Sequence, residues 1–238
     1  MNFKEAYGVC MPEAKQKKER YNIWVALCVR PLSVLFTLPL IKTDIKPSTV
    51  TLWSIYASLI GFFLVAGGWG IKISVIGWFF FFIWAVLDGV DGNLARCQGT
   101  SSPMGELWDA TGGYAAMILI YFSAGIAAYY DNNYFDFFSK EFLLIFGGAT
   151  ALFSIFPRLI MHKKKSSGII DKSVNKLQDK THFGIGQIVA MNLISVSGFM
   201  QVIFLICILT HTLNFFIVFY MIVNCLIMIK SVMSLLKE

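Results

Sequence analysis

The chain has 238 residues, of which 57% are hydrophobic and 14% charged, and its mean hydropathy is +0.67. This composition is far more apolar than that of an ordinary soluble domain, and the length allows one compact membrane domain with little else. The formal net charge is +6, but no basic stripe with interleaved aromatic residues occurs away from the membrane flanks, so we expect no nucleic-acid partner.

Residues 1–48 are predicted to form a cytoplasmic N-terminal segment. Between Pro12 and Arg30, a basic run precedes aromatic and aliphatic residues that include Trp24. This order is typical of an amphipathic helix that lies in the membrane interface. The simplest role for such a helix is that of a membrane anchor. Pro47 fits the start of the next helix, where Ser48 is a possible cap.

Six apolar segments are long enough for a membrane-spanning helix, which needs about 20 residues. They run from Thr49 to Ala66, Ile71 to Arg96, Gly105 to Tyr129, Glu141 to Met161, Gly186 to Leu209 and Leu213 to Leu235. The predicted fold class is therefore all-α, an integral membrane bundle of six transmembrane helices over residues 49–238, preceded by the N-terminal interfacial helix.

Basic residues set the expected orientation of a membrane protein, because they gather on the cytoplasmic side. They are dense before the first predicted span and again between the fourth and fifth, from Lys163 to Lys180. The connection between the third and fourth spans is acidic and polar, with Asp131 and Asp136. We therefore expect both termini, and the connection from Ala95 to Gly105, to face the cytoplasm.

Three aspartates lie within or beside these apolar segments, where ionised side chains are costly and usually functional. Asp88, Asp91 and Ala95 are three or four residues apart and share one helix face with Gly92. Asp109 begins the next helix and is expected to face them. Carboxylates that converge in this way need a cation between them, and their oxygens suit Mg²⁺, Mn²⁺ or Ca²⁺.

The spacing of these residues resembles the signature of the CDP-alcohol phosphotransferases. Seven fixed positions of that signature match, namely Asp88, Asp91, Gly92, Ala95, Arg96, Gly105 and Asp109. The signature ends in a further aspartate, and this chain has Gly113 there. In the family, that aspartate is the proposed catalytic base and helps to hold the metals.

The resemblance implies a site with two divalent cations, Mg²⁺ or Mn²⁺, held by Asp88, Asp91 and Asp109, with Asp109 also catalytic. Arg96 is expected to bind a diphosphate oxygen or to orient an aspartate. Small side chains let the nucleotide approach the backbone at Gly92, Ala95 and Gly105. Ser48 and Thr51 are expected near the cytidine, and Arg158 near a substrate phosphate. The alternative role for Gly92 and Ala95, as for Gly112 and Gly113, is to permit close helix packing, and this is the favoured role of Gly112.

Glu106 has two interpretations. It follows Gly105 at a helix start, where the helix dipole favours a carboxylate, and this is the favoured role. It is also a candidate substitute for the missing base. Arg158 is likewise explained in part by the positive charge expected on the cytoplasmic side.

The five cysteines are scattered without a CxxC pair, so the sequence indicates neither zinc nor a disulfide framework. Cys97 follows Arg96 and is read as a spacer residue rather than a nucleophile.

The expected activity is transfer of a substituted phosphoryl group from a CDP-linked donor to a lipid or phosphorylated acceptor, with release of CMP. The resemblance also implies a homodimer, and it favours a role for the N-terminal helix as a platform that borders the active site. The alternatives are a catalytically impaired CDP-binding scaffold subunit and a transporter. Transporters commonly contain inverted repeats, and none is visible here.

Overall fold

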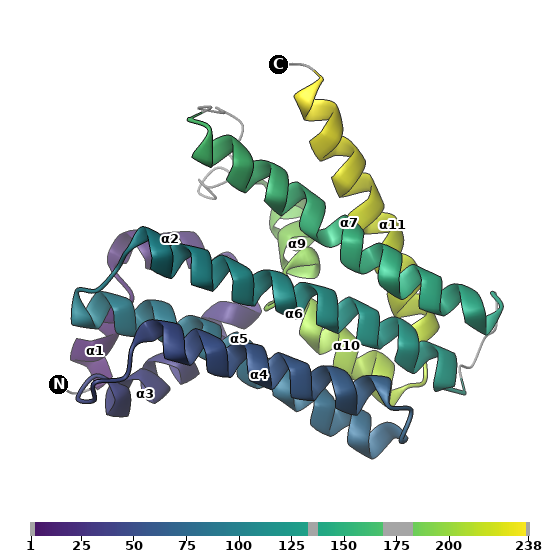
Figure 1. Cartoon of the computed structure of the whole chain (residues 1–238), viewed down its shortest axis with the longest axis horizontal. Helices are drawn as coiled ribbons and strands as arrows, with labels where there is room; N and C mark the ends of the chain where they lie inside the picture. The colour runs from purple at the N-terminus through teal and green to yellow at the C-terminus, as the bar shows by residue number, and fades with distance from the viewer. Residues whose placement is uncertain (1–2, 133–137, 169–182, 237–238) are drawn as a thin grey trace. The chain divides into compact units, whose positions relative to one another are not determined.

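The computed structural model describes residues 3–132, 138–168 and 183–236, which form helices and turns with no strand among them (Figure 1). The N-terminal helices are α1 Phe3–Cys10, α2 Glu13–Glu19, the π-helical turn η1 Val25–Val29 and α3 Arg30–Leu40. The long helices are α4 Pro47–Ala66, α5 Ile71–Gln98, α6 Pro103–Tyr130, α7 Lys140–Ser166 and α11 Leu213–Leu235, with the shorter α9 Ile185–Ile194 and α10 Phe199–Leu209 before the last. The predicted all-α fold class is confirmed.

In the part of the chain that the structure describes, five helices are long and apolar enough to cross a membrane, namely α4, α5, α6, α7 and α11. Helices α9 and α10 together supply a sixth candidate span. The chain is therefore a multi-pass integral membrane protein, with five or six candidate spans among the described residues. Long apolar runs form helices in lipid because a helix satisfies all its backbone polar groups internally.

The predicted continuous fifth span, from Gly186 to Leu209, is wrong in one respect. The helix breaks between Ile194 and Phe199, and its two halves are bent by 58°. A side chain at Gly198 has no room, since an added Cβ would lie 2.7 Å from Ser195 Cβ and 2.9 Å from Asn22 Oδ1. The break therefore lies where the N-terminal segment packs against this part of the chain.

The N-terminal segment is also more divided than predicted. The basic residues belong to α2, and the chain turns at residues 20–22 before the apolar helix that contains Trp24 begins. This turn is held by Asn192 of α9, whose side-chain amide donates to the Tyr21 carbonyl and accepts from the Ile23 N–H. The predicted segment is therefore divided between the short α2 and a longer helix that continues through η1 into α3, and their place in the membrane interface stays a prediction.

The residues group into two compact units. The first contains Met1–Ser58, Phe80–Ala115 and Asp179–Val202, and the second contains Leu59–Phe79, Ala116–Gln178 and Ile203–Glu238. The first unit holds all the signature positions, and the second holds most of the remaining apolar helices. The predicted functional boundary after residue 48 stays a prediction.

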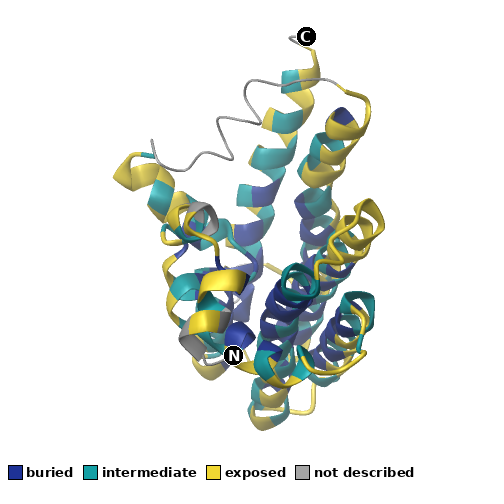
Figure 2. Ribbon diagram, turned by 90° about the vertical axis from the view of Figure 1, so that its left-hand side faces the viewer, coloured by how far each residue is buried: buried dark blue, intermediate teal, exposed yellow. Residues whose placement is uncertain are grey.

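In the second unit, α11 packs against α7. The first half of α11 carries the buried residues Phe216, Ile217 and Tyr220, whereas no residue of α11 after Asn224 is buried. Figure 2 shows the helix that leads to the C-terminus becoming half-buried and exposed towards its end. The core of this unit is aromatic, with the Tyr121 and Tyr220 rings 5.7 Å apart between centroids.

Helices α6 and α7 touch backbone to backbone at two glycines of this unit. A Cβ added at Gly125 would lie 2.6 Å from Gly147 Cα and 2.7 Å from the Leu143 carbonyl oxygen. Small residues permit such close helix contacts in membranes. We expect Gly125→Ala to destabilise the protein by about 1–3 kcal/mol, because backbone atoms cannot move aside as a flexible side chain can.

The matched control for this prediction is Gly148→Ala, since a Cβ at Gly148 of α7 meets nothing within 4 Å. Thermal unfolding in detergent should show a lower midpoint for Gly125→Ala alone. Equal midpoints for the two variants would contradict the close α6–α7 contact.

The predicted orientation can be tested with two exposed positions, Asn132 after α6 and Ser166 at the end of α7. With the five native cysteines replaced by serine, Asn132→Cys should react with an impermeant maleimide added to intact cells, and Ser166→Cys should not. The reason is the positive-inside rule applied to the lysines near Ser166. The reverse labelling pattern would refute the orientation.

Candidate active site

Asp91 is the best-defined carboxylate of the signature. It lies on α5 with 3% of its surface exposed. Thr51 Oγ1 of α4 donates to Asp91 Oδ2 at 2.6 Å, and the Gly92 N–H donates to Oδ1 at 2.5 Å. Burial of an ionised carboxylate is costly without such hydrogen bonds. Thr51, predicted to lie near the cytidine, is therefore placed where it orients a signature aspartate.

Asp109 lies on the first turns of α6 and is exposed, as is every residue of α6 before it. One turn further on, an added Cβ at Gly112 would lie 3.2 Å from Thr51 Cγ2, so α6 passes close to α4 here. Residues three apart share a helix face, and Asp109 is thus directed towards the same region as Thr51. The charge of Asp109 acts on Asp91, as the charge of Arg30 also does.

Asp88, Asp91 and Asp109 are the predicted ligands of the metal centre, and this assignment stays a prediction. Among residues 3–132, 138–168 and 183–236, no three His, Cys, Asp or Glu side chains lie close enough together to hold a metal ion. The donor chemistry nevertheless fits a hard divalent cation, because Asp91 and Asp109 bring two mutually repelling carboxylates within electrostatic reach. Asp88 lies half-buried one turn before Asp91 on α5. These three residues are the ones that would hold the ions.

Two hydrogen bonds hold the Arg96 side chain near the end of α5, the helix that carries Asp88 and Asp91. Its Nε donates to the Cys10 carbonyl at 3.0 Å, and its Nη2 donates to Asn93 Oδ1 at 2.7 Å. The guanidinium lies over Gly92, where an added Cβ would be 3.4 Å from Nη1. A fixed planar cation at this point is suited to a diphosphate oxygen.

Helix α3 packs against the signature helix through polar groups that the sequence analysis did not single out. Asn93 Nδ2 donates to Ser33 Oγ at 3.2 Å and to Thr37 Oγ1 at 3.4 Å. At Gly89, an added Cβ would lie 2.8 Å from Ser33 Cβ. The available signal was Asn93 itself, a polar side chain in an apolar span, which usually has a partner there.

Arg30 and Glu19 form an ion pair next to this contact. Glu19 accepts from both Nε and Nη2 of Arg30, the latter at 2.7 Å. Arg30 Nη1 lies 3.0 Å from an added Cβ at Gly89. The bidentate pair fixes the guanidinium beside the aspartate face of α5. The N-terminal segment therefore contributes a positioned cation to this region.

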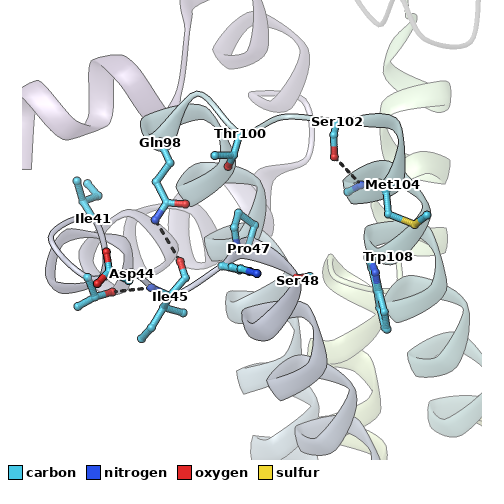
Figure 3. Close-up of a pocket in the computed structure, with 13 residues that line it drawn as sticks. Ile41, Asp44, Ile45, Pro47, Ser48, Gln98, Thr100, Ser102, Met104 and Trp108 are labelled. Atoms are coloured by element: carbon cyan, nitrogen blue, oxygen red, sulfur yellow. Dashed lines mark hydrogen bonds between the residues drawn. The ribbon is translucent and has the colours of Figure 1, made fainter.

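A pocket of about 620 Å³ opens between the start of α4 and the start of α6 (Figure 3). Ser48 and Lys46 line one side, and Gly105 and Trp108 line the other. Ser102 shapes the second side, because its Oγ accepts from the Gly105 N–H at 3.1 Å and caps α6. Helix α4 already begins at Pro47, so Ser48 lies inside the first turn and lines the pocket instead of capping.

Of the remaining predicted site residues, Ala95, Glu106 and Gly113 belong to the first unit and Arg158 to the second. Ala95 is half-buried on α5, and Glu106 is exposed in the first turn of α6, a position where the helix dipole favours a carboxylate. Gly113 lies further along α6, and an added Cβ there meets nothing within 4 Å. Arg158 is exposed on α7 and belongs to the second unit, where its charge acts on Tyr121. Its role at a substrate phosphate stays a prediction.

The comparison with protein families gives a match over most of the chain. The family model described as CDP-alcohol phosphatidyltransferase matches residues 45–227. This range contains the whole signature and all the candidate spans except the end of α11. No curated protein sequence matches the chain.

Proposed function

Because the chain belongs to the CDP-alcohol phosphatidyltransferase family, we propose that it transfers a substituted phosphoryl group from a CDP-linked donor to an acceptor in the membrane and releases CMP. The observation that supports this most strongly is the arrangement of the three side chains Thr51, Asp91 and Asp109. The charge of Asp109 acts on the buried, hydrogen-bonded carboxylate of Asp91, and Trp108, which directly precedes Asp109 in the chain, lines the pocket at the start of α4 and α6.

In this proposal, the pocket receives the cytidine end of the donor. Its volume of about 620 Å³ falls within the range of small-molecule sites. Trp108 offers an aromatic face to a base, and Ser48 and Lys46 offer polar groups opposite it. The expected positions of Ser48 and Gly105 near the nucleotide are consistent with this assignment.

The diphosphate of the donor would lie between the pocket and the aspartates. Arg96, held over Gly92, is placed to bind a phosphate oxygen there. Bound divalent cations would neutralise the diphosphate and stabilise the leaving CMP. The protein's own residues then orient the donor so that the acceptor oxygen can approach in line with the leaving group.

For the acceptor, we propose a lipid that carries its own phosphate. A hydroxyl acceptor needs a base near its proton, and Gly113 stands where the family has an aspartate for this role. A phosphate acceptor is already anionic and needs no such base. We also expect a homodimer, as the resemblance implies.

A screen of the purified protein tests this function. CMP release would be measured from several CDP-alcohols and from CDP-diacylglycerol, each with a hydroxyl acceptor and with a polyprenyl phosphate. CMP formation that depends on an acceptor supports the proposal. Metal-dependent CDP binding with no CMP release from any donor would instead indicate the impaired scaffold subunit.

A further inference from the structure

Two cysteines that are far apart in the sequence lie in contact beside Arg96. Cys10 Sγ at the end of α1 is 3.1 Å from Cys97 Sγ near the end of α5. None of the five cysteines forms a disulfide. A sulfur–sulfur bond is about 2.05 Å long, so a small movement of either side chain would join these two atoms.

The two thiols differ in accessibility. Cys10 is fully buried in a small apolar cluster with Met11 and Val34, and Cys97 packs against this cluster but is partly exposed. An oxidant can therefore reach Cys97 first, while Cys10 is held next to it. This is the arrangement of a thiol with a resolving partner.

The pair is linked to the candidate active site through one backbone group. The Cys10 carbonyl accepts the hydrogen bond from Arg96 Nε at 3.0 Å. Cys97 directly follows Arg96 on α5. A disulfide would therefore link Cys10, whose carbonyl accepts the hydrogen bond from Arg96, to Cys97, which follows Arg96 in the chain.

We propose that Cys10 and Cys97 are a site of reversible oxidation, whose disulfide fixes Arg96 in its position over Gly92. The oxidant is a hydroperoxide such as hydrogen peroxide. The Cys97 sulfur attacks one peroxide oxygen, which gives a sulfenic acid and releases water. The Cys10 sulfur then attacks the Cys97 sulfur, which forms the S–S bond and releases a second water. Two electrons pass from the thiols to the peroxide, and a dithiol reductant reverses the change.

The first test measures the bond itself and does not depend on any substrate. The full-length protein in detergent, with Cys28, Cys207 and Cys225 replaced by serine, is treated with hydrogen peroxide and mapped by non-reducing peptide mass spectrometry. We expect a peptide pair joined through Cys10 and Cys97, with loss of two hydrogen atoms. Cys97→Ser and Cys10→Ser should each abolish it, and dithiothreitol should reverse it.

A wild-type digest provides the matched comparison, because it retains the other three thiols. Preferential formation of the Cys10–Cys97 peptide in this mixture supports the assignment. Absence of the joined peptide, or equal cross-linking among all five cysteines, would overturn it.

The second test concerns Arg96 and rests on the proposed CDP-binding function. A guanidinium held in its binding position loses less freedom on binding, so the oxidised protein should bind CDP about threefold more tightly than the reduced protein. Cys97→Ser should bind CDP equally well before and after peroxide. If the joined peptide forms but the CDP affinity of the wild type is unchanged, the link to Arg96 is wrong. If the reduced wild type binds no CDP, the proposed function fails while the disulfide assignment is decided by the mapping alone.

Discussion

Replacing Asp109 by asparagine should abolish metal-dependent CDP binding, with a loss of affinity on the order of 100-fold or more. Asp109 and Asp91 repel each other across the site, and a divalent cation between them would relieve that repulsion and neutralise the diphosphate. Asp88→Asn should have the same effect. Isothermal titration with CDP in the presence of Mg²⁺ or Mn²⁺ measures the change.

A matched control is Glu141→Gln, which removes one negative charge from the first turn of α7 in the second unit. It should leave CDP affinity unchanged. The wild type in excess chelator should behave like Asp109→Asn. Undiminished CDP affinity in the chelator would show that the aspartates do not work through a metal.

Replacing Gly113 by aspartate should reduce transfer to a phosphate-bearing acceptor by roughly tenfold or more, because a new negative charge repels an anionic substrate. The same variant should gain activity towards a hydroxyl acceptor, since a positioned base contributes roughly 10²–10⁴-fold to such a reaction. Product formation from the two acceptor classes, with the same CDP-linked donor, measures both effects.

The structure allows the effect of the new charge in Gly113→Asp to be separated from the effect of its size. A Cβ at Gly113 meets nothing within 4 Å, so the longer side chain has room at its base. Gly113→Asn has nearly the same size as Gly113→Asp but no charge, and it should keep near-native transfer to the phosphate acceptor. Equal losses in both variants would point to a steric effect.

Two outcomes would reject the phosphate-acceptor hypothesis. One is a natural acceptor that is a neutral alcohol, and the other is a rise in native activity in Gly113→Asp. In either case another base is required, and Glu106, exposed in the first turn of the same helix, is the first residue to test.

The sequence alone determined the helical class, most of the spans and the family. Apolar runs of about 20 residues have few structural options in lipid, so the predicted span from Ile71 to Arg96 corresponds closely to α5, Ile71–Gln98. The signature is a local pattern of fixed spacing within 22 residues, from Asp88 to Asp109. Both features depend on neighbours along the chain and can be read without a structure.

Only the tertiary structure decided the partners of these residues. Thr51 reaches Asp91 across 40 positions, and Arg96 reaches the Cys10 carbonyl across 86. Helical periodicity specifies which face a residue lies on, but it does not specify which other helix covers that face.

The break in the fifth span likewise depends on packing that the sequence pattern does not specify. The sequence contains a local signal, since Ser195, Ser197 and Gly198 interrupt an apolar run. Small residues of this kind also occur inside straight membrane helices, so the signal was ambiguous. Asn22 packs against the bend, since its Nδ2 donates to Ser195 Oγ at 2.8 Å and its Oδ1 would lie 2.9 Å from a Cβ added at Gly198. The hydrogen bond joins residues 173 positions apart, so it is a property of the packed chain rather than of a local pattern.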